Sequence, residues 1–341
     1  MKVGMYYRNS DVRLEEQDIP AIGDDDVLIK VMASGICGSD LMEWYRIKRA
    51  PLVLGHELAG EVVAVGGNVD TVKTGDRVFA THHVPCDECR YCLAGHETAC
   101  VTFQEKNNFT PGGFSQFLKV SGRSVRTGLL KLPDSISYQT ATFIEPLATV
   151  VRACRTMALA PADSVLIYGA GLAGILFVKL AKALGAGTVT VADINTYRLE
   201  MARKAGADYV VQASEDVPAY LMQTCGRLAD RVVISTGALP AAEAGLQSVD
   251  RGGTVLFFAV AQPGETVAVD FNPFWRNDIS FKTCYGAAPR DNRQALELLR
   301  NGTVKVDDMI THRLGIEQIG EAFRIAAEPT GTLKVIVEPH R

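Results

Sequence analysis

Four cysteines of this 341-residue chain lie close together, with the spacing Cys86-x2-Cys89-x2-Cys92-x7-Cys100. Four thiolates on one short segment can close a tetrahedral shell around Zn²⁺ that leaves no coordination position open. A closed shell cannot bind a substrate, so we expect a structural zinc at these residues. An iron–sulfur cluster, which also uses four thiolates, and a metal-free cysteine cluster are the alternatives.

A second set of side chains of the metal-binding type is more dispersed along the sequence. Cys37 lies in the segment GICGSD at residues 35–40, His56 and Glu57 follow the apolar run PLVL and a glycine, and Glu145 is a candidate fourth member. Thiolate, imidazole and carboxylate groups all bind zinc. The residues alone leave two interpretations open, a metal site or polar residues with purely structural partners.

The segment GAGLAG that begins at Gly169 fits the pattern G-x-G-x-x-G between an expected strand and an expected helix, which is the context that this pattern requires. In a dinucleotide site, Gly169 makes the tight turn, Gly171 lets the backbone approach a pyrophosphate, and Gly174 permits close packing of the helix. Leu172 and Ala173 open the helix, whose free N–H groups and dipole favour phosphate binding.

An acidic residue, Asp193, ends the next expected strand, 19 residues after Gly174. A carboxylate at this place accepts hydrogen bonds from the ribose hydroxyls of an adenosine and repels a 2′-phosphate, so the sequence favours NAD over NADP. Arg198 follows a helical turn later, where it can lie over the adenine or be a cation on the helix surface.

The type of secondary structure that the sequence predicts around these residues changes along the chain. Short valine-rich segments with glycine turns, at 27–31, 60–65 and 77–79, predict a compact β-barrel-like domain at the N-terminal end. We expect the cysteine-rich stretch 85–100 to be a loop. We also expect a Pro-Gly-Gly turn followed by a strand at 114–120.

From about residue 160, short apolar runs alternate with amphipathic segments. This alternation predicts a parallel sheet with helices on both faces. The expected strands are 164–168, 188–192, 209–211, 231–234 and 254–258, and the expected helices are 172–184 and 196–204. Near the C-terminal end we expect helices at 292–300 and 316–327 and a strand at 333–337.

The length and composition limit the function. At roughly 150 residues per domain, 341 residues suggest two domains, and 47% hydrophobic residues with 22% charged residues are ordinary for a globular protein. A net charge of −4 without a basic block argues against a nucleic-acid partner, and no apolar run is long enough to span a membrane. The N-terminus shows no secretion signal, so we expect a cytoplasmic protein.

Together these motifs resemble the zinc-containing medium-chain alcohol dehydrogenase family, in its polyol and threonine dehydrogenase branch. The resemblance extends over essentially the whole chain, and its motifs occur in the family's order. The segments that carry it are GHE-x2-G-x5-G-x2-V from Gly55, the segment 35–40, the four-cysteine segment, GAGLAG, K-x-GDRV from Lys73, and G-x2-KV from Gly331.

The resemblance implies an α/β protein of two domains. A GroES-like β-barrel catalytic domain would comprise residues 1–150 and be completed by 286–341. A doubly wound parallel-sheet Rossmann domain at 151–285 would bind NAD, and the active site would lie in the cleft between the two domains.

By the same resemblance, Cys37, His56 and Glu57 would carry a catalytic zinc. Glu145 lies in IEPLA, which matches the branch's Glu-Pro-Leu segment, and would be a direct or water-mediated neighbour of that zinc. Ser39 would take the proton of the substrate hydroxyl and pass it to the cofactor ribose.

One departure from the family pattern concerns proton transfer. The family often has a histidine two residues after the aspartate of the first-ligand segment, and Met42 occupies that position here. In threonine dehydrogenases that histidine belongs to the proton relay, so Met42 disfavours threonine as the substrate.

The segment that contains Trp44, Tyr45, Arg46 and Arg49 lies between the first two candidate ligands. It can line the substrate cleft, with the arginines meeting a carboxylate or phosphate, or it can be a solvated loop.

We therefore expect an enzyme with two zinc ions per chain and NAD. It would oxidise a secondary alcohol of a small polyol, sugar derivative or cyclitol to a ketone. A threonine-type amino-acid alcohol dehydrogenase and a non-catalytic NAD(H)-binding member are the alternatives. We also expect a homo-oligomer, a dimer or a tetramer.

Overall fold

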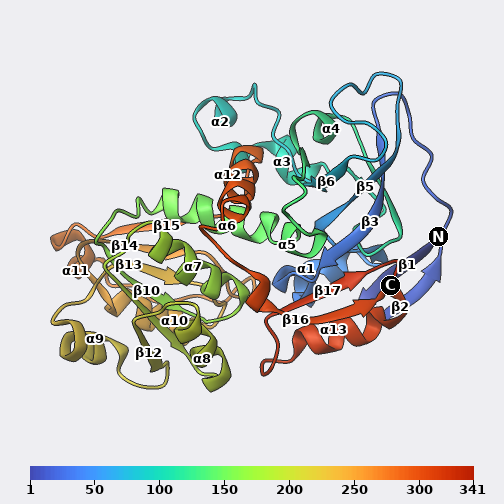
Figure 1. The fold of residues 1–341 in the computed structure, drawn as a ribbon. Helices are drawn as coiled ribbons and strands as arrows, with labels where there is room; N and C mark the ends of the chain where they lie inside the picture. The colour runs from blue at the N-terminus through green and yellow to red at the C-terminus, as the bar shows by residue number, and fades with distance from the viewer. The chain divides into compact units, whose positions relative to one another are not determined.

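A computed structural model describes all 341 residues, and the chain divides into two compact units. Unit 1 comprises Met1–Ala148 and Gly286–Arg341, and unit 2 comprises Thr149–Tyr285. Figure 1 shows the N-terminal strands in blue and the C-terminal strands in red side by side within unit 1. No helix has both the length and the apolar character needed to cross a membrane.

Unit 1 contains two β-sheets with mainly antiparallel strands. The smaller has the order β2-β1-β4, and the larger has the order β16-β17-β3-β5-β6-β9, with β8 paired to β3 and β7 to β8. The strands of unit 1 are β1 Lys2–Arg8, β2 Asp11–Glu16, β3 Val27–Gly35, β4 Leu52–Val53, β5 Glu57–Val65, β6 Arg77–Ala80, β7 Phe109–Thr110, β8 Phe117–Val120, β9 Leu129–Lys131, β16 Ile310–Gly315 and β17 Lys334–Glu338.

Two apolar clusters form the core of unit 1. Tyr6, Phe114 and Phe323 are fully buried in one cluster, and Ile29 and Leu58 are fully buried in the other. Every second residue of the first half of β3 is buried, as the two-residue period of a strand requires. The helices that begin in unit 1 are α1 Glu43–Arg46, α2 Arg90–Leu93, α3 Val101–Glu105, α4 Arg123–Thr127, α5 Tyr138–Ala141, α6 Ile144–Thr156, α12 Pro289–Arg300 and α13 Ile319–Ala327.

Unit 2 is a parallel six-stranded sheet with the order β12-β11-β10-β13-β14-β15. The order reverses between β10 and β13, and ligands of such sheets bind beyond the carboxyl ends of the strands at this place. Its strands are β10 Ser164–Tyr168, β11 Thr188–Asp193, β12 Tyr209–Gln212, β13 Ala229–Ile234, β14 Val249–Phe257 and β15 Ser280–Thr283. Its helices are α7 Leu172–Ala183, α8 Thr196–Lys204, α9 Val217–Cys225, α10 Leu239–Gln247 and α11 Phe271–Arg276.

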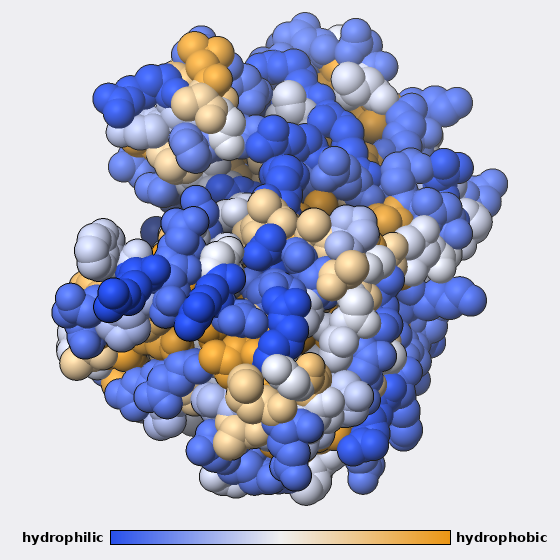
Figure 2. All heavy atoms as spheres, turned by 90° about the vertical axis from the view of Figure 1, so that its left-hand side faces the viewer, coloured by the Kyte–Doolittle hydropathy of each residue, from blue (hydrophilic) through white to orange (hydrophobic).

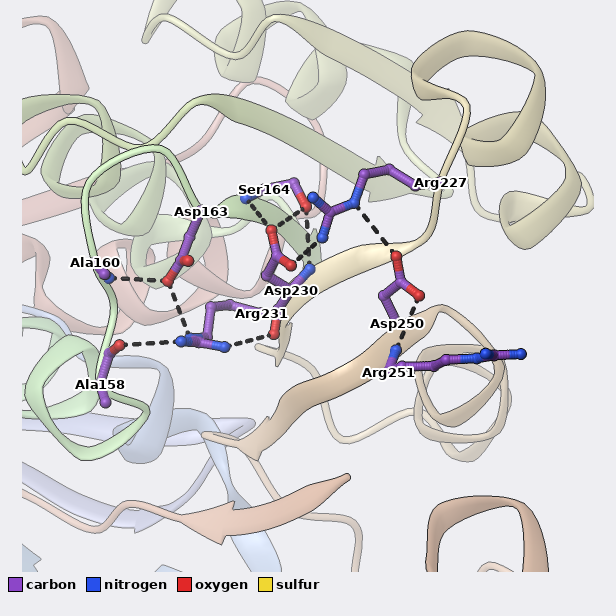
Figure 3. A network of polar contacts seen from close by, with 9 residues as sticks. All are labelled: Ala158, Ala160, Asp163, Ser164, Arg227, Asp230, Arg231, Asp250 and Arg251. Carbon is purple, nitrogen blue, oxygen red and sulfur yellow. Dashed lines mark hydrogen bonds and ion pairs between the residues drawn. The ribbon is translucent and has the colours of Figure 1, made fainter. Parts of the chain in front are cut away.

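A polar network holds the opposite, amino ends of these strands together (Figure 3). Asp230, in β13, accepts hydrogen bonds from the backbone N–H and the hydroxyl of Ser164, both at 2.8 Å, where β10 begins. Arg227 bridges Asp230 to Asp250 of β14. The network fixes the strands at the edge away from the expected cofactor site.

The fold differs from the sequence expectation in a few elements. The stretch 85–100 is not entirely a loop, because it contains α2 and a 3₁₀ turn at Glu97–Ala99. The strand expected at 114–120 begins only at Phe117, and Ser115 before it pairs with Val3 as an isolated β-bridge. Several elements had no expected counterpart, among them the strands β1, β2, β9, β15 and β16 and the helices α9, α10 and α11.

Candidate active site and zinc centres

Strand pairing in unit 1 brings the dispersed metal-binding residues together. Strand β3 ends two residues before Cys37, and its last residue, Gly35, lies opposite Glu57, the first residue of β5. On the other side of β3, Ile336 of β17 also lies opposite Gly35, which brings Lys334 to the same end of the sheet. The site is therefore assembled by strands that are far apart in the sequence.

The ligand atoms of Cys37, His56 and Glu57 all lie within 4.8 Å of one another. Glu57 is fully buried, and its Oε1 has no hydrogen-bond partner, whereas Oε2 pairs with Lys334. An unpartnered buried carboxylate oxygen is costly unless a cation occupies the space beside it. A thiolate, an imidazole and a carboxylate make a three-ligand set with a further position open, so these residues fit a catalytic zinc.

The Lys334 ammonium balances part of the negative charge at this site. It is fully buried, it also donates to the carbonyl oxygen of Ile36 at 3.3 Å, and it lies over the Phe143 ring. Burial lowers the pKa of Lys334 to about 8, so the ammonium stays protonated at neutral pH. The ion pair holds one oxygen of Glu57 and leaves the other for a metal ion.

Asp40 orients the imidazole of His56. It is fully buried in the 3₁₀ turn Gly38–Leu41, and its Oδ1 lies 3.5 Å from Nδ1 of His56. Its Oδ2 accepts a hydrogen bond of 3.1 Å from the backbone N–H of Cys37. A carboxylate on one ring nitrogen leaves the other nitrogen for a metal ion and makes it more basic.

The charges around Cys37 and His56 shift the pKa values of these two residues in opposite directions. Burial lowers the pKa of His56, but Asp40 and the Cys37 thiolate outweigh it and raise this pKa to about 9. Burial also raises the pKa of Cys37, and the nearby His56 outweighs it, so the net direction is downward. Zinc binding therefore has to release the His56 proton.

Glu145 does not belong to the three-residue group. It is the second residue of α6, and it interacts electrostatically with His56, Asp40 and Arg46. Burial raises the pKa of Glu145. The carboxylate therefore lies near the site without a place among the close ligand atoms.

Ser39 lies beside the first candidate ligand. Its hydroxyl donates to Sγ of Cys37 at 3.3 Å and accepts a hydrogen bond of 2.9 Å from Nη2 of Arg46. Met42 follows as the cap of the turn that contains Ser39. Of the two arginines of this segment, Arg46 is directed into the protein, whereas Arg49 is exposed.

Two histidines beside the site were missed in the sequence. The ring of His82 lies 5.1 Å from that of His56 and 3.8 Å from that of His83, centroid to centroid. Burial holds the pKa of His82 well below its usual value and lowers that of His83 to about 4, so both are neutral. Nδ1 of His82 is buried without a hydrogen-bond partner. Their place before the four-cysteine segment was the only signal.

The four sulfur atoms of Cys86, Cys89, Cys92 and Cys100 also lie within 4.8 Å of one another. The sulfurs of Cys89 and Cys92 are 3.5 Å apart, and those of Cys86 and Cys92 are 3.9 Å apart. Tetrahedral zinc with Zn–S distances of 2.3 Å separates its sulfurs by about 3.8 Å. Burial raises the pKa of Cys100, but N–H donors such as that of Cys86 lower it to about 6. The set therefore fits a closed zinc site.

The GAGLAG segment of unit 2 connects β10 to α7 as the sequence predicts. Gly169 has a φ of +96°, which favours glycine, and a Cβ on Gly174 would collide with the carbonyl oxygen of Gly169. A Cβ on Gly171 would meet no atom within 4 Å, so open space lies above this residue. Leu172 and Ala173 form the first turn of α7.

Asp193 is the last residue of β11 and is 6% exposed. Its oxygens accept hydrogen bonds from the backbone N–H of Ala170 at 2.6 Å and of Asn195 at 2.8 Å. Each carboxylate oxygen keeps acceptor capacity for a further donor. Arg198 lies in the first turn of α8, and its Nε is buried without a hydrogen-bond partner.

Two family models match the chain. The alcohol dehydrogenase GroES-like domain matches residues 23–134, and the zinc-binding dehydrogenase model matches residues 173–301.

Similar proteins span nearly the whole chain. It is 34% identical to a sorbitol dehydrogenase of Bacillus subtilis, over 100% of this chain and 98% of that protein. It is 37% identical to an L-threonine 3-dehydrogenase of Pyrococcus abyssi, over 92% of this chain and 91% of that one. A solved zinc-binding dehydrogenase of Sinorhizobium meliloti, bound to NADP, has a TM-score of 0.89 and 26% identity and covers 99% of both chains.

The chain therefore belongs to the zinc-binding alcohol dehydrogenases with a GroES-like domain, in the polyol and threonine dehydrogenase branch. It is an oxidoreductase of the class that acts on CH–OH groups. The predicted family, enzyme class and two-part α/β fold are confirmed.

Proposed function

We propose that the chain is a zinc- and NAD-dependent dehydrogenase that oxidises a secondary alcohol of a polyol, sugar derivative or cyclitol to a ketone. The observation that carries this proposal is the buried group of Cys37, His56 and Glu57, whose Glu57 Oε1 has no hydrogen-bond partner. The similarity to a sorbitol dehydrogenase over the full chain supports it.

Cys37, His56 and Glu57 would hold the catalytic zinc. When bound, zinc supplies a Lewis acid that lowers the pKa of the substrate hydroxyl towards neutrality. Asp40 keeps the His56 ring oriented, and Lys334 keeps Glu57 oriented. Glu145, whose pKa is raised by burial, would act at the edge of the zinc site, directly or through a water molecule.

Ser39 would receive the proton of the substrate hydroxyl on an oxygen lone pair. Its own hydrogen, which is directed at Sγ of Cys37 in the structure, would turn and pass on towards the cofactor. Its Oγ lies beside Sγ of Cys37, a candidate ligand, at 3.3 Å. NAD, when bound, supplies the hydride acceptor.

The side chains around the site favour a neutral substrate. Arg46 bonds to Ser39 and Asp40, so it is committed within the protein and is not free to pair with a substrate carboxylate. His82 and His83 are neutral, so they add no positive charge that would favour an anionic substrate.

Two other functions are alternatives to this proposal. The similarity to L-threonine 3-dehydrogenases supports a threonine-type enzyme, but Met42 and the committed Arg46 oppose it. A non-catalytic NAD(H)-binding protein would have no use for the complete set of Cys37, His56, Glu57 and Ser39.

We propose NAD rather than NADP as the cofactor, bound by Gly169, Gly171, Leu172, Ala173 and Gly174. Asp193 would meet the ribose hydroxyls, and Arg198 would lie near the adenine. The NADP of the Sinorhizobium meliloti structure belongs to that protein. In this chain, exposed Ile194 and then Asn195 follow the aspartate, so no cation is next to it to bind a 2′-phosphate.

We also propose a cytoplasmic homo-oligomer, a dimer or a tetramer. Thiolate metal sites persist where cysteines stay reduced. The edge strand β15 is largely exposed, and the preceding helix α11 exposes 84% of Trp275 and 63% of Phe271. Hydrophobic residues gather in patches on a largely hydrophilic face in Figure 2. Unpaired strand edges and exposed aromatic groups favour pairing with another chain.

A substrate screen tests the function. Zinc-loaded protein with NAD is offered sorbitol and other polyols, cyclitols, sugar acids, sugar phosphates and L-threonine, and NADH formation is followed. We expect the highest kcat/KM with a neutral polyol or cyclitol. A preference for L-threonine would establish the alternative, and no turnover with any alcohol would overturn the proposal.

A further inference from the structure

Arg46, at the end of α1, connects the two groups that flank the candidate zinc ligands. Its Nε donates to the carbonyl oxygen of Ser39 at 3.0 Å, and its Nη2 donates to the Ser39 hydroxyl at 2.9 Å. The same Nη2 lies 3.3 Å from Oδ1 of Asp40, and the guanidinium lies 4.8 Å from the centre of the Tyr45 ring. The Arg46 side chain is only 15% exposed.

Because Arg46 donates to the Ser39 hydroxyl, this hydroxyl oxygen has only one lone pair left to accept another hydrogen. A serine hydroxyl has one hydrogen and two lone pairs. In the structure the hydrogen is directed at Sγ of Cys37, and Arg46 occupies one lone pair. Only the second lone pair can accept a proton. A guanidinium carries only donors, so Arg46 can donate to the Ser39 oxygen and cannot accept its hydrogen.

The same guanidinium also reaches the residue that orients the metal-binding histidine. Oδ1 of Asp40 lies within 3.5 Å of both Arg46 Nη2 and His56 Nδ1. A shift of Arg46 would therefore move the proton-accepting serine and the histidine together. A lysine has one point of attachment and cannot reproduce a planar fork across these acceptors.

We propose that Arg46 is a positioning residue for the reaction, which fixes the Ser39 hydroxyl for proton transfer and couples it through Asp40 to the zinc ligand His56. This inference rests on the proposed function, because it assigns a partner to the Ser39 step. It also makes Arg46 an internal hydrogen-bond donor, in place of the substrate-facing or solvent-facing cation that the sequence left open.

The test compares Arg46→Met and Arg46→Lys with the wild type and with Lys48→Ala, which replaces an exposed cation two residues away. Folding is checked by circular dichroism and thermal unfolding. We expect Arg46→Met to lower kcat about 10- to 100-fold at nearly unchanged KM and to weaken binding of the catalytic zinc by a similar factor, measured by chelator competition. Arg46→Lys should recover only part of kcat.

Two measurements separate positioning from a structural role. The solvent deuterium isotope effect on kcat should rise in Arg46→Met, because proton transfer becomes slower. Added guanidinium ion should restore part of the activity of Arg46→Ala and none of that of Ser39→Ala.

The inference is overturned if a folded Arg46→Met matches Lys48→Ala in kcat and zinc affinity. It is also overturned if kcat falls with no change in the isotope effect and no rescue by guanidinium. A wild-type protein that oxidises no alcohol would overturn the proposed function and this inference together.

Discussion

In the side chains of the candidate zinc site, one polar atom interacts with the protein and another is left to bind zinc. One oxygen of Glu57 pairs with Lys334, and the other has no protein partner. Nδ1 of the His56 ring lies 3.5 Å from Oδ1 of Asp40, which leaves Nε2 for zinc. Lys334 and Asp40 thus fix the orientation of Glu57 and His56. The atoms of these two residues that would bind zinc keep no other protein partner.

Removing the Ser39 hydroxyl tests its place in proton transfer. We expect Ser39→Ala to slow alcohol oxidation at neutral pH by roughly 10²-fold, the scale of a positioned proton-transfer group. The loss should shrink at high pH, where hydroxide from the solvent takes the proton. The pH dependence of kcat for both proteins decides this, and a Ser39→Ala profile identical to that of the wild type would remove Ser39 from the relay.

Cofactor choice tests Asp193. Near neutral pH a 2′-phosphate carries a charge of about −1.5 to −2, and it would meet the carboxylate of a residue that is 6% exposed. We expect NAD to be preferred over NADP by on the order of 10²-fold or more in kcat/KM. Asp193→Ser should narrow the difference mostly by weakening NAD. Equal efficiency of both cofactors in the wild type would contradict this role.

The sequence was enough to predict the candidate zinc ligands but not the residues that orient them. Cys37, His56 and Glu57 lie in recognisable segments. Lys334 was part of a matching motif, yet its pairing with Glu57 joins residues 277 positions apart, which no local pattern reveals. Arg46 was interpreted as facing either the substrate or solvent, because a sequence does not show to which side an arginine turns.

Among the elements, the four-cysteine lobe depends most on a metal ion. Only the four-residue helix α2 and a 3₁₀ turn give it regular structure, and Leu93 is 77% exposed there. Too little apolar surface is buried for the lobe to keep its shape without another constraint.

We therefore expect Cys89→Ser to lose one zinc per chain and to lower the Tm, with activity falling mainly through the loss of folded protein. Zinc content and thermal unfolding measure this. Cys225→Ser, which changes a cysteine at the end of α9 outside both clusters, is the control and should keep both zinc ions. A stable Cys89→Ser protein with two zinc ions would contradict the structural assignment.

Elements with a strong pattern were predictable, and elements defined by tertiary contacts were not. Strand β10 is almost entirely apolar, and in β11 even Thr190 is buried, because both faces of a parallel sheet are covered. Strand β15 has only one half-buried residue, and its sequence therefore carries no strand period. The four-residue helix α2 is too short to have a helical period.

On the scale of the whole molecule, the exposed edge of unit 2 bears on assembly. Trp275 and Phe271 are exposed on α11, and Phe271 contacts Phe281 of β15 with ring centres 6.1 Å apart. We expect Trp275→Glu to weaken self-association, because a carboxylate replaces apolar contact area. Met222→Glu, which changes an exposed residue of α9, is the control. Light scattering with size-exclusion chromatography gives the masses, and a monomeric wild type would contradict the proposed oligomer.

We expect turnover to require zinc at Cys37, His56 and Glu57, and a comparison of the wild type with His56→Ala decides this. Zinc content, NADH formation with the best polyol, and NAD binding are measured for the wild type and for His56→Ala. We expect two zinc ions and turnover in the wild type, and one zinc ion, no turnover and undiminished NAD binding in His56→Ala. NAD binding should persist because its residues, from Gly169 to Arg198, belong to unit 2. Undiminished turnover in a His56→Ala protein with a single zinc would contradict the account.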